Sequence, residues 1–150
     1  MSLEQKIMEQ MKTAMKSKDE AALRTLRSIK AEILKEKTAA GAKEEITEAD
    51  EQKMLQRMAK QRRDSLQIFE QQNREDLAAK EREELGILEQ FLPRQLSESE
   101  LRSALQEIIA ETGASSPADM GKVMGAATKK LAGQADGKAI SAMTKELLSQ

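Results

Sequence analysis

Apolar residues recur three or four positions apart through most of the 150-residue chain, and this spacing predicts helices. The first helix is expected to end near Ser17 to Asp19, and the second to give way to a polar link around Gly41. Their inward-facing stripes are predicted to be Leu3, Ile7, Met11 and Met15 in the first helix, and Leu23, Leu26, Ile29, Ile33 and Leu34 in the second. No segment alternates β-branched and polar residues, so the sequence predicts an all-α fold.

Two longer helices are predicted to follow the polar link. The third begins at Thr47, whose hydroxyl can cap it with Asp50 three residues later, and ends near Gln72. The fourth covers Asp76 to Leu92. The inward residues of the third helix are expected to be Met54, Leu55, Met58, Leu66 and Phe69.

A break follows at Pro93, which lacks a backbone N–H and disfavours helical geometry at Leu92. Ser97 and Glu100 form a capping-box pattern, so a new helix is expected within a few residues. We therefore predict an N-terminal helical domain of about four helices over residues 1–92, and a small three-helix module over residues 93–150.

The module's first helix is predicted to close at Gly113, and its second to be capped by Ser116 with Pro117 in the first position. The link before its third helix, in the stretch AGQADGKAIS, is close to the spacing of a phosphate-binding loop. However, its glycines enclose three residues instead of four, and an alanine follows the lysine. We therefore interpret Gly133 as a left-handed helix end and Asp136 as the carboxylate cap of the next helix.

The composition narrows the possible chemistry. The chain has no Cys and no His, which excludes thiolate sites and the common catalytic triads and zinc sites, so we expect no metal and no cofactor. Basic and acidic residues are nearly balanced, 25 against 26, so no overall field favours nucleic acid or membrane. The first residues resemble neither a secretory nor a transit signal, and no apolar stretch is long enough to span a bilayer. We expect a cytoplasmic protein.

Two charged residues fall on apolar helix faces. Arg62 lies among the apolar positions of the third helix, and Glu81 among those of the fourth. Since either would be costly to bury alone, we predict that they form an ion pair between the helices, with a ligand-facing pair as the alternative. Glu83 and Glu84 are predicted to lie on solvated faces, because the His that completes a di-iron motif is absent.

Basic residues gather in two places. The group in the third helix is interpreted as a solvated face, because Glu51 and Asp64 offset it; its members are Lys53, Arg57, Lys60, Arg62 and Arg63. In the module, Lys122 and Lys129 are expected to project from one outer face, with Lys130 beside them and Lys138 in the first turn of the next helix. These four lysines are candidates for binding RNA phosphates by charge alone. No aromatic residue lies nearby, which argues against stacking on unpaired bases.

Two long segments resemble a known family. The segment KQRRDSLQIFEQQNREDLAAKEREELGILEQFLPRQLSESEL and the later DMGKVMGAATKKLAGQADGKAISAMTKELL are similar to the central and C-terminal parts of YqeY-like proteins. The resemblance implies a helical N-terminal domain and a module also found at the end of one subunit of the glutamyl-tRNA(Gln) and aspartyl-tRNA(Asn) amidotransferases. In those enzymes the module helps engage tRNA, while amide transfer occurs in another domain. The resemblance places five residues on the shared module pattern, where we expect them to serve packing and capping: Gly121, Met124, Gly133, Ala135 and Asp136.

These observations favour a non-catalytic accessory protein that associates with tRNA or other RNA through the C-terminal module. One alternative is a protein-interaction adaptor without RNA binding, whose N-terminal bundle docks a partner through an exposed apolar strip. A second is a component of carbon–nitrogen ligase activity with glutamine as amido-N-donor, as in the larger amidotransferases. No catalytic residue is recognisable in the sequence.

Overall fold

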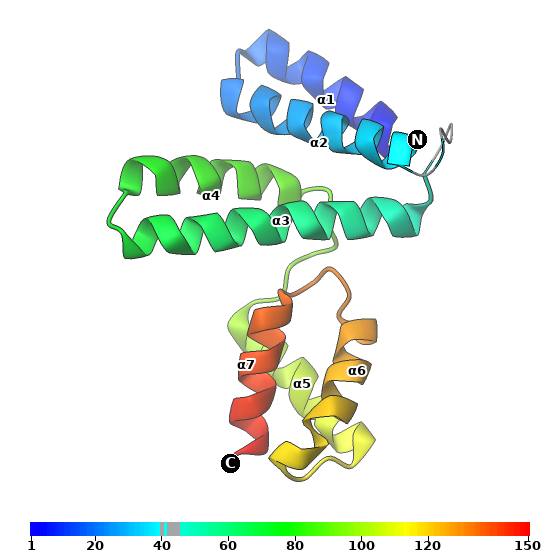
Figure 1. Ribbon diagram of the computed structural model, residues 1–150, viewed down its shortest axis with the longest axis vertical. Helices are drawn as coiled ribbons and strands as arrows, with labels where there is room; N and C mark the ends of the chain where they lie inside the picture. Colours follow the sequence, from blue (N-terminus) through cyan, green and yellow to red (C-terminus); the bar gives the residue numbers. More distant parts are fainter. Residues whose placement is uncertain (40, 42–45) are drawn as a thin grey trace. The chain divides into compact units, whose positions relative to one another are not determined.

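The computed structural model describes residues 1–39, 41 and 46–150. All regular elements in this part of the chain are helical, which confirms the predicted all-α fold (Figure 1). Contacts between Cα atoms divide the chain into two compact units, Met1–Leu92 and Pro93–Gln150. That each unit folds on its own stays a prediction. The predicted polar link around residues 40–45 lies outside the described residues, except for Gly41.

Unit 1 consists of two helical hairpins: α1 (Leu3–Ser17) with α2 (Glu20–Ala39), and α3 (Glu48–Gln71) with α4 (Glu75–Glu89). Helix α2 packs against both α3 and α4 and so joins the hairpins. The core is aliphatic, as the composition requires. Its buried residues are Leu3, Ile7, Ala14, Leu26, Ile29, Ile33, Met54, Leu55, Met58, Ala59, Leu88 and Leu92.

Side-chain caps begin three of these helices, and Asp19 caps α2 by accepting from the Ala22 N–H at 3.1 Å. Thr47 Oγ1 accepts a hydrogen bond from the Asp50 N–H at 3.1 Å, as predicted. At α1, Ser2 Oγ accepts from the Gln5 N–H at 3.2 Å, and Gln5 Oε1 accepts from the Ser2 N–H at 2.9 Å. This second capping box was not predicted, although its S-x-x-Q pattern is visible in the sequence.

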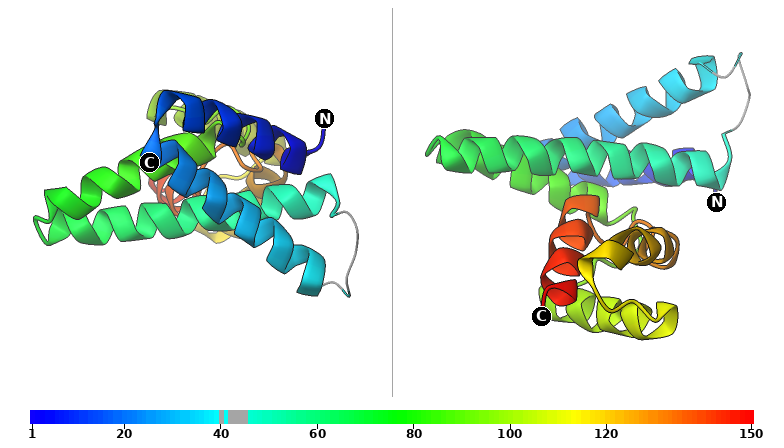
Figure 2. Two further views of the ribbon diagram at one scale, coloured as in Figure 1. Left: turned by 90° about the horizontal axis from the view of Figure 1, so that it is seen from above. Right: turned by 60° about the horizontal axis from the view of Figure 1, so that its bottom comes forward.

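Some predicted core positions of unit 1 are wrong. Met15 is 60% exposed and Leu34 is 52% exposed, while Ala14 is buried in place of Met15. Leu66 and Phe69 are only half-buried. The reason for the last two is that the α3–α4 turn extends beyond the α1–α2 hairpin, so the distal half of α3 packs against a single helix (Figure 2).

Unit 2 contains α5 (Glu98–Thr112), a short 3-10 turn η1 (Pro117–Asp119), α6 (Met120–Lys130) and α7 (Gly137–Leu148). Each α-helix packs against the other two. The buried core residues are Leu101, Leu105, Ile108, Val123, Ala127, Leu131, Ile140, Met143 and Leu148. The predicted capping box is present at α5, with the Glu100 N–H donating to Ser97 Oγ at 3.2 Å and the Ser97 N–H donating to Glu100 Oε1 at 3.1 Å. Gly113 ends the helix in the left-handed region, with φ 70°.

Two predicted caps of unit 2 are wrong. Ser116 makes no side-chain cap, and the Asp119 carboxylate instead accepts from the Ser115 N–H at 3.0 Å. Asp136 occupies the N-cap position of α7, but only its backbone carbonyl is used, accepting from the Ile140 N–H at 3.0 Å. Gly133 is left-handed, with φ 75°, although α6 has already ended at Lys130.

The segment before α5 is anchored to the link between α6 and α7. The Leu96 N–H donates to the Gln134 carbonyl at 2.8 Å, and Gln95 Nε2 donates to the Gly133 carbonyl at 2.6 Å. Residues 93–97 are therefore a structural part of unit 2. In the part of the chain that the structure describes, no helix has the length and apolar character needed to cross a membrane.

Candidate functional site

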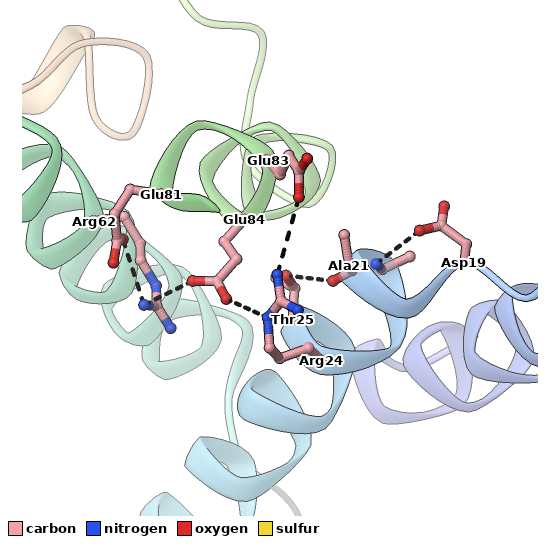
Figure 3. Close-up of polar contacts among 9 residues, drawn as sticks. Asp19, Ala21, Arg24, Thr25, Arg62, Glu81, Glu83 and Glu84 are labelled. Carbon is pink, nitrogen blue, oxygen red and sulfur yellow. Dashed lines mark hydrogen bonds and ion pairs between the residues drawn. The ribbon is translucent and has the colours of Figure 1, made fainter. Parts of the chain in front are cut away.

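Arg62 of α3 belongs to a charged cluster on the inner side of α4 (Figure 3). Its Nη1 is 3.4 Å from Glu81 Oε2, so the structure brings the two predicted partners together. A shorter contact, 2.8 Å, joins the same nitrogen to Glu84 Oε2. The main partner of Arg62 is therefore Glu84.

The prediction that Glu84 lies on a solvated face is wrong. The residue is only 7% exposed, because it sits one turn after Glu81 and one turn before the buried Leu88, on the face of α4 that meets the other helices. Its second oxygen, Oε1, is 2.8 Å from Nε of Arg24, which projects from α2. Helical spacing from Leu88 is the sequence signal for this burial, whereas the absence of His bears only on metal binding.

Glu84 thus connects three helices through one carboxylate. One of its oxygens accepts a charge-assisted hydrogen bond from Arg24 of α2, and the other forms an ion pair with Arg62 of α3. The hydrogen bond to Glu84 is also the main cause that raises the pKa of Arg24. Glu83, by contrast, is 4.0 Å from Arg24 and more than half of its side chain is exposed. Since both oxygens of Glu84 are occupied by protein donors, we interpret the cluster as a clamp between helices.

The other basic residues of α3 are largely neutralised. Arg57 Nη2 lies 2.8 Å from Glu36 Oε1, Lys60 Nζ lies 3.5 Å from Asp64 Oδ2, and Arg63 Nη2 lies 3.5 Å from Glu89 Oε1. This face therefore offers few charges to an external polyanion. Among the described residues, no group of three or more His, Cys, Asp or Glu side chains is arranged to hold a metal ion.

The four candidate lysines of unit 2 differ in their surroundings. Lys130 forms an ion pair with Glu111 of α5, so its charge is already countered. Lys138 is exposed in the first turn of α7. Lys122 and Lys129 are exposed on α6, and neither lies within 4.0 Å of a carboxylate among the described residues. Because they are seven residues apart, two helical turns, they share one face.

Two exposed glycines lie beside these lysines on α6. Gly121 and Gly125 are exposed, and a Cβ added at either position would meet nothing within 4 Å. The expectation that Gly121 serves close packing inside the chain is therefore wrong. Met124 and Ala135 do pack against the core of unit 2. We call the surface formed by Gly121, Lys122, Gly125 and Lys129 the α6 face.

Comparisons with known proteins agree with the resemblance seen in the sequence. Residues 4–148 match the family described as Yqey-like protein. The chain is also similar to "Altered inheritance of mitochondria protein 41, mitochondrial" of Pyrenophora tritici-repentis, with 32% identity over 146 residues that cover 92% of this chain and 76% of the relative. The chain therefore belongs to the YqeY-like family.

Proposed function

We propose that this chain is a non-catalytic accessory protein that binds folded RNA, with tRNA as the first candidate, through the α6 face of unit 2. The observation that carries the proposal is the pair of exposed lysines, Lys122 and Lys129, on a helix that contains three lysines and no acidic residue. The proposal involves binding and no chemical step, and the cytoplasm stays the predicted compartment.

The spacing of the two lysines suits a phosphate backbone. Seven residues of α-helix separate their Cα atoms by about 10 Å along the axis. Long flexible side chains at that separation can each reach a different phosphate. Lys130 and Lys138 are expected to add less, Lys130 because Glu111 competes for it.

The glycines support close approach of a ligand to the helix. A glycine inside a helix costs roughly 0.5–1 kcal/mol relative to alanine, and no contact among the described residues requires one at position 121 or 125. Because Gly121, just before the first lysine, and Gly125, between the two lysines, carry no Cβ atom, the helix backbone can approach a bulky partner at these positions. Because both glycine positions are open, alanine can be placed there to test RNA affinity separately from the stability of the helix.

The charge distribution within unit 2 favours contact through α6. Helix α5 carries four Glu and one Arg, whereas α6 carries lysines alone. Unit 2 also contains no aromatic residue, since Phe69 and Phe91 both lie in unit 1. Stacking on unpaired bases is therefore disfavoured, and the supported ligand is a folded or duplex RNA recognised through its phosphates. This agrees with the tRNA engagement that the family resemblance implies.

The experiment that tests the proposal is fluorescence-anisotropy titration of labelled tRNA with the full chain at low salt. We expect Lys122→Glu combined with Lys129→Glu to weaken binding about tenfold or more, because two phosphate contacts become repulsive. The matched control is Lys53→Glu with Lys80→Glu, which changes the net charge equally in unit 1. Absence of tRNA binding by the unmodified chain, or equal losses in both variants, would contradict the proposal.

A further double variant distinguishes a binding face from a merely exposed helix. Gly121→Ala with Gly125→Ala should raise the melting temperature, because alanine is the better helix former and both positions are open. The same variant should bind tRNA more weakly if the RNA backbone approaches the glycines. Unchanged affinity in the stabilised variant would restrict the contact to the lysine side chains.

A further inference from the structure

Helix α1 carries methionines beside the face that packs on the core of unit 1, and two of them are exposed. Met8 is 46% exposed and Met15 is 60% exposed, and they lie two turns apart on one side of the helix. Met11, between them at helical spacing, is half-buried against the core. We call Met8, Met11 and Met15 the methionine ridge.

Positive charge flanks this ridge. Lys12 lies between Met8 and Met15 along the outer side of α1, and Lys16 follows one turn later. Both are exposed, and among the described residues neither has a carboxylate within 4.0 Å. The wider α1–α2 hairpin has the same sign, since residues 1–39 contain nine Lys or Arg against six Asp or Glu.

The acidic residues of the hairpin are mostly engaged elsewhere. Glu4 pairs with Lys37 at 2.6 Å, Glu36 with Arg57 at 2.8 Å, and the Asp19 carboxylate accepts from the Ala22 N–H at 3.1 Å. Glu9 is exposed on α1, but helical geometry places it on the far side of Lys12 and Lys16 from the ridge. The methionine ridge is therefore an apolar surface that is bordered by the positive charges of Lys12 and Lys16.

We propose that the methionine ridge is a docking site for an amphipathic helix of a protein partner, whose apolar side chains pack on Met8 and Met15 and whose carboxylates pair with Lys12 and Lys16. Methionine is flexible and polarisable, which suits a surface that must pack against a helix. The border of exposed lysines selects a partner of negative charge. This site is in unit 1 and is independent of the RNA proposal for unit 2.

A membrane surface fits these residues less well. Helices that lie in a bilayer interface usually present Trp, Phe or Leu on a broad apolar face. In α1, Leu3 and Ile7 are buried in the core, and the helix contains no aromatic residue. Only the methionine ridge remains, which is wide enough for one helix but narrow for insertion among lipids.

The first test places a photo-crosslinking benzoylphenylalanine at position 15 of the full chain in cells, with position 68 as the control. Ile68 is a suitable control because it is also an exposed aliphatic residue, 50% exposed, but lies on α3. We expect position 15 to cross-link to a segment of another protein that has apolar residues at helical spacing and a net negative charge. Cross-linking to lipid, to a second copy of this chain, to the same products as position 68, or to nothing would overturn the proposal.

The second test uses a synthetic peptide of the cross-linked segment and the purified full chain. Met8→Ser with Met15→Ser, and separately Lys12→Glu with Lys16→Glu, should each weaken peptide binding about tenfold or more, while Ile68→Ser should leave it unchanged. A peptide with its acidic residues replaced by lysine should bind the Lys12→Glu, Lys16→Glu variant better than it binds the unmodified chain.

Two results of these binding measurements would overturn the proposal. One is loss of peptide binding in the Ile68→Ser variant, and the other is a lysine-substituted peptide that does not prefer the Lys12→Glu, Lys16→Glu variant. Sedimentation with phosphatidylserine vesicles that depends on Met8 and Met15 would also overturn it. Circular dichroism of each variant checks that the helices are retained.

Discussion

Arg24 on α2 and Glu84 on α4 are 60 residues apart in the sequence, and their Nε and Oε1 atoms lie 2.8 Å apart. The other oxygen of Glu84 lies equally close, at 2.8 Å, to Nη1 of Arg62 on α3. One nearly buried carboxylate therefore holds both helical hairpins of unit 1 together. Breaking this clamp should loosen the contact of α2 with the α3–α4 hairpin.

Glu84→Gln should lower the free energy of unfolding, because two guanidinium groups lose the charge that neutralises them. A fully buried pair broken in this way costs about 3–5 kcal/mol. Since the side chains of Arg24 and Arg62 are 44% and 29% exposed, water compensates part of the loss, and we expect about 1–3 kcal/mol. Urea unfolding measures the change.

Two neighbouring carboxylates serve as matched controls for that change. Glu81→Gln should cost less than Glu84→Gln, because its contact with Arg62 is longer, at 3.4 Å. Glu83→Gln should cost least, because it is exposed and 4.0 Å from Arg24. Any other order of the three variants would contradict the assignment of Glu84 as the centre of the clamp.

The clamp also shows what could and could not be predicted from the sequence. Helical spacing is enough to give the all-α fold, most buried positions, and the approach of Arg62 to Glu81. It cannot show that α2 covers the same face of α4, so it does not predict the contact between Arg24 and Glu84. Spacing describes the faces of one helix, whereas the partner of each face depends on how the helices pack. The exposure of Met15 and Leu34 has the same origin.

The caps of α5 and α7 should respond differently to the same kind of change. Ser97→Ala should cost about 1 kcal/mol of unfolding free energy, because it removes the hydroxyl that accepts from the Glu100 N–H. Asp136→Ala should cost clearly less, because the Asp136 side chain makes no cap hydrogen bond. Chemical denaturation of both variants makes the comparison. A larger loss for Asp136→Ala would show that its carboxylate does cap α7 in solution.

The carboxyl of Glu100 should remain ionised at pH values well below 4.5, where an ordinary glutamate is protonated. The guanidinium of Arg94, followed by the backbone and side chain of Ser97, lowers the pKa of Glu100 to about 2 from its ordinary value of 4.5. A folded-state pKa below the unfolded value means that ionised Glu100 stabilises the fold above about pH 4.5. That contribution is lost as the pH falls from about 4.5 to about 2.

Carbon-detected NMR titration of the Glu100 carboxyl measures this directly. The midpoint should lie near 2 in the unmodified chain and should rise in Arg94→Met. A midpoint near 4.5 that does not change in Arg94→Met would mean that the pair with Arg94 does not persist in solution.

The two units should be separable when the chain is cut before Pro93. A fragment of residues 93–150 should give the circular dichroism of a helical protein and a cooperative melt. A fragment of residues 98–150 should melt lower, because it lacks the Gln95 and Leu96 hydrogen bonds to the link between α6 and α7. Brief proteolysis of the full chain is predicted to cut near Arg94 to Glu98, or in the polar link near residues 40–45, before it cuts any helix interior. If neither fragment folds and the full chain melts in one transition, the units are not independent domains.

The salt dependence of tRNA binding tests the central claim, which is phosphate recognition by the α6 face. The logarithm of the affinity should fall linearly with the logarithm of salt concentration, and each phosphate contact contributes about 0.9 to the slope on a duplex. Lys122→Glu with Lys129→Glu should reduce the slope by about 1.8, two such contacts, while the Lys53→Glu, Lys80→Glu control keeps it. Equal slopes for the unmodified chain and the Lys122→Glu, Lys129→Glu variant would contradict RNA binding through this face.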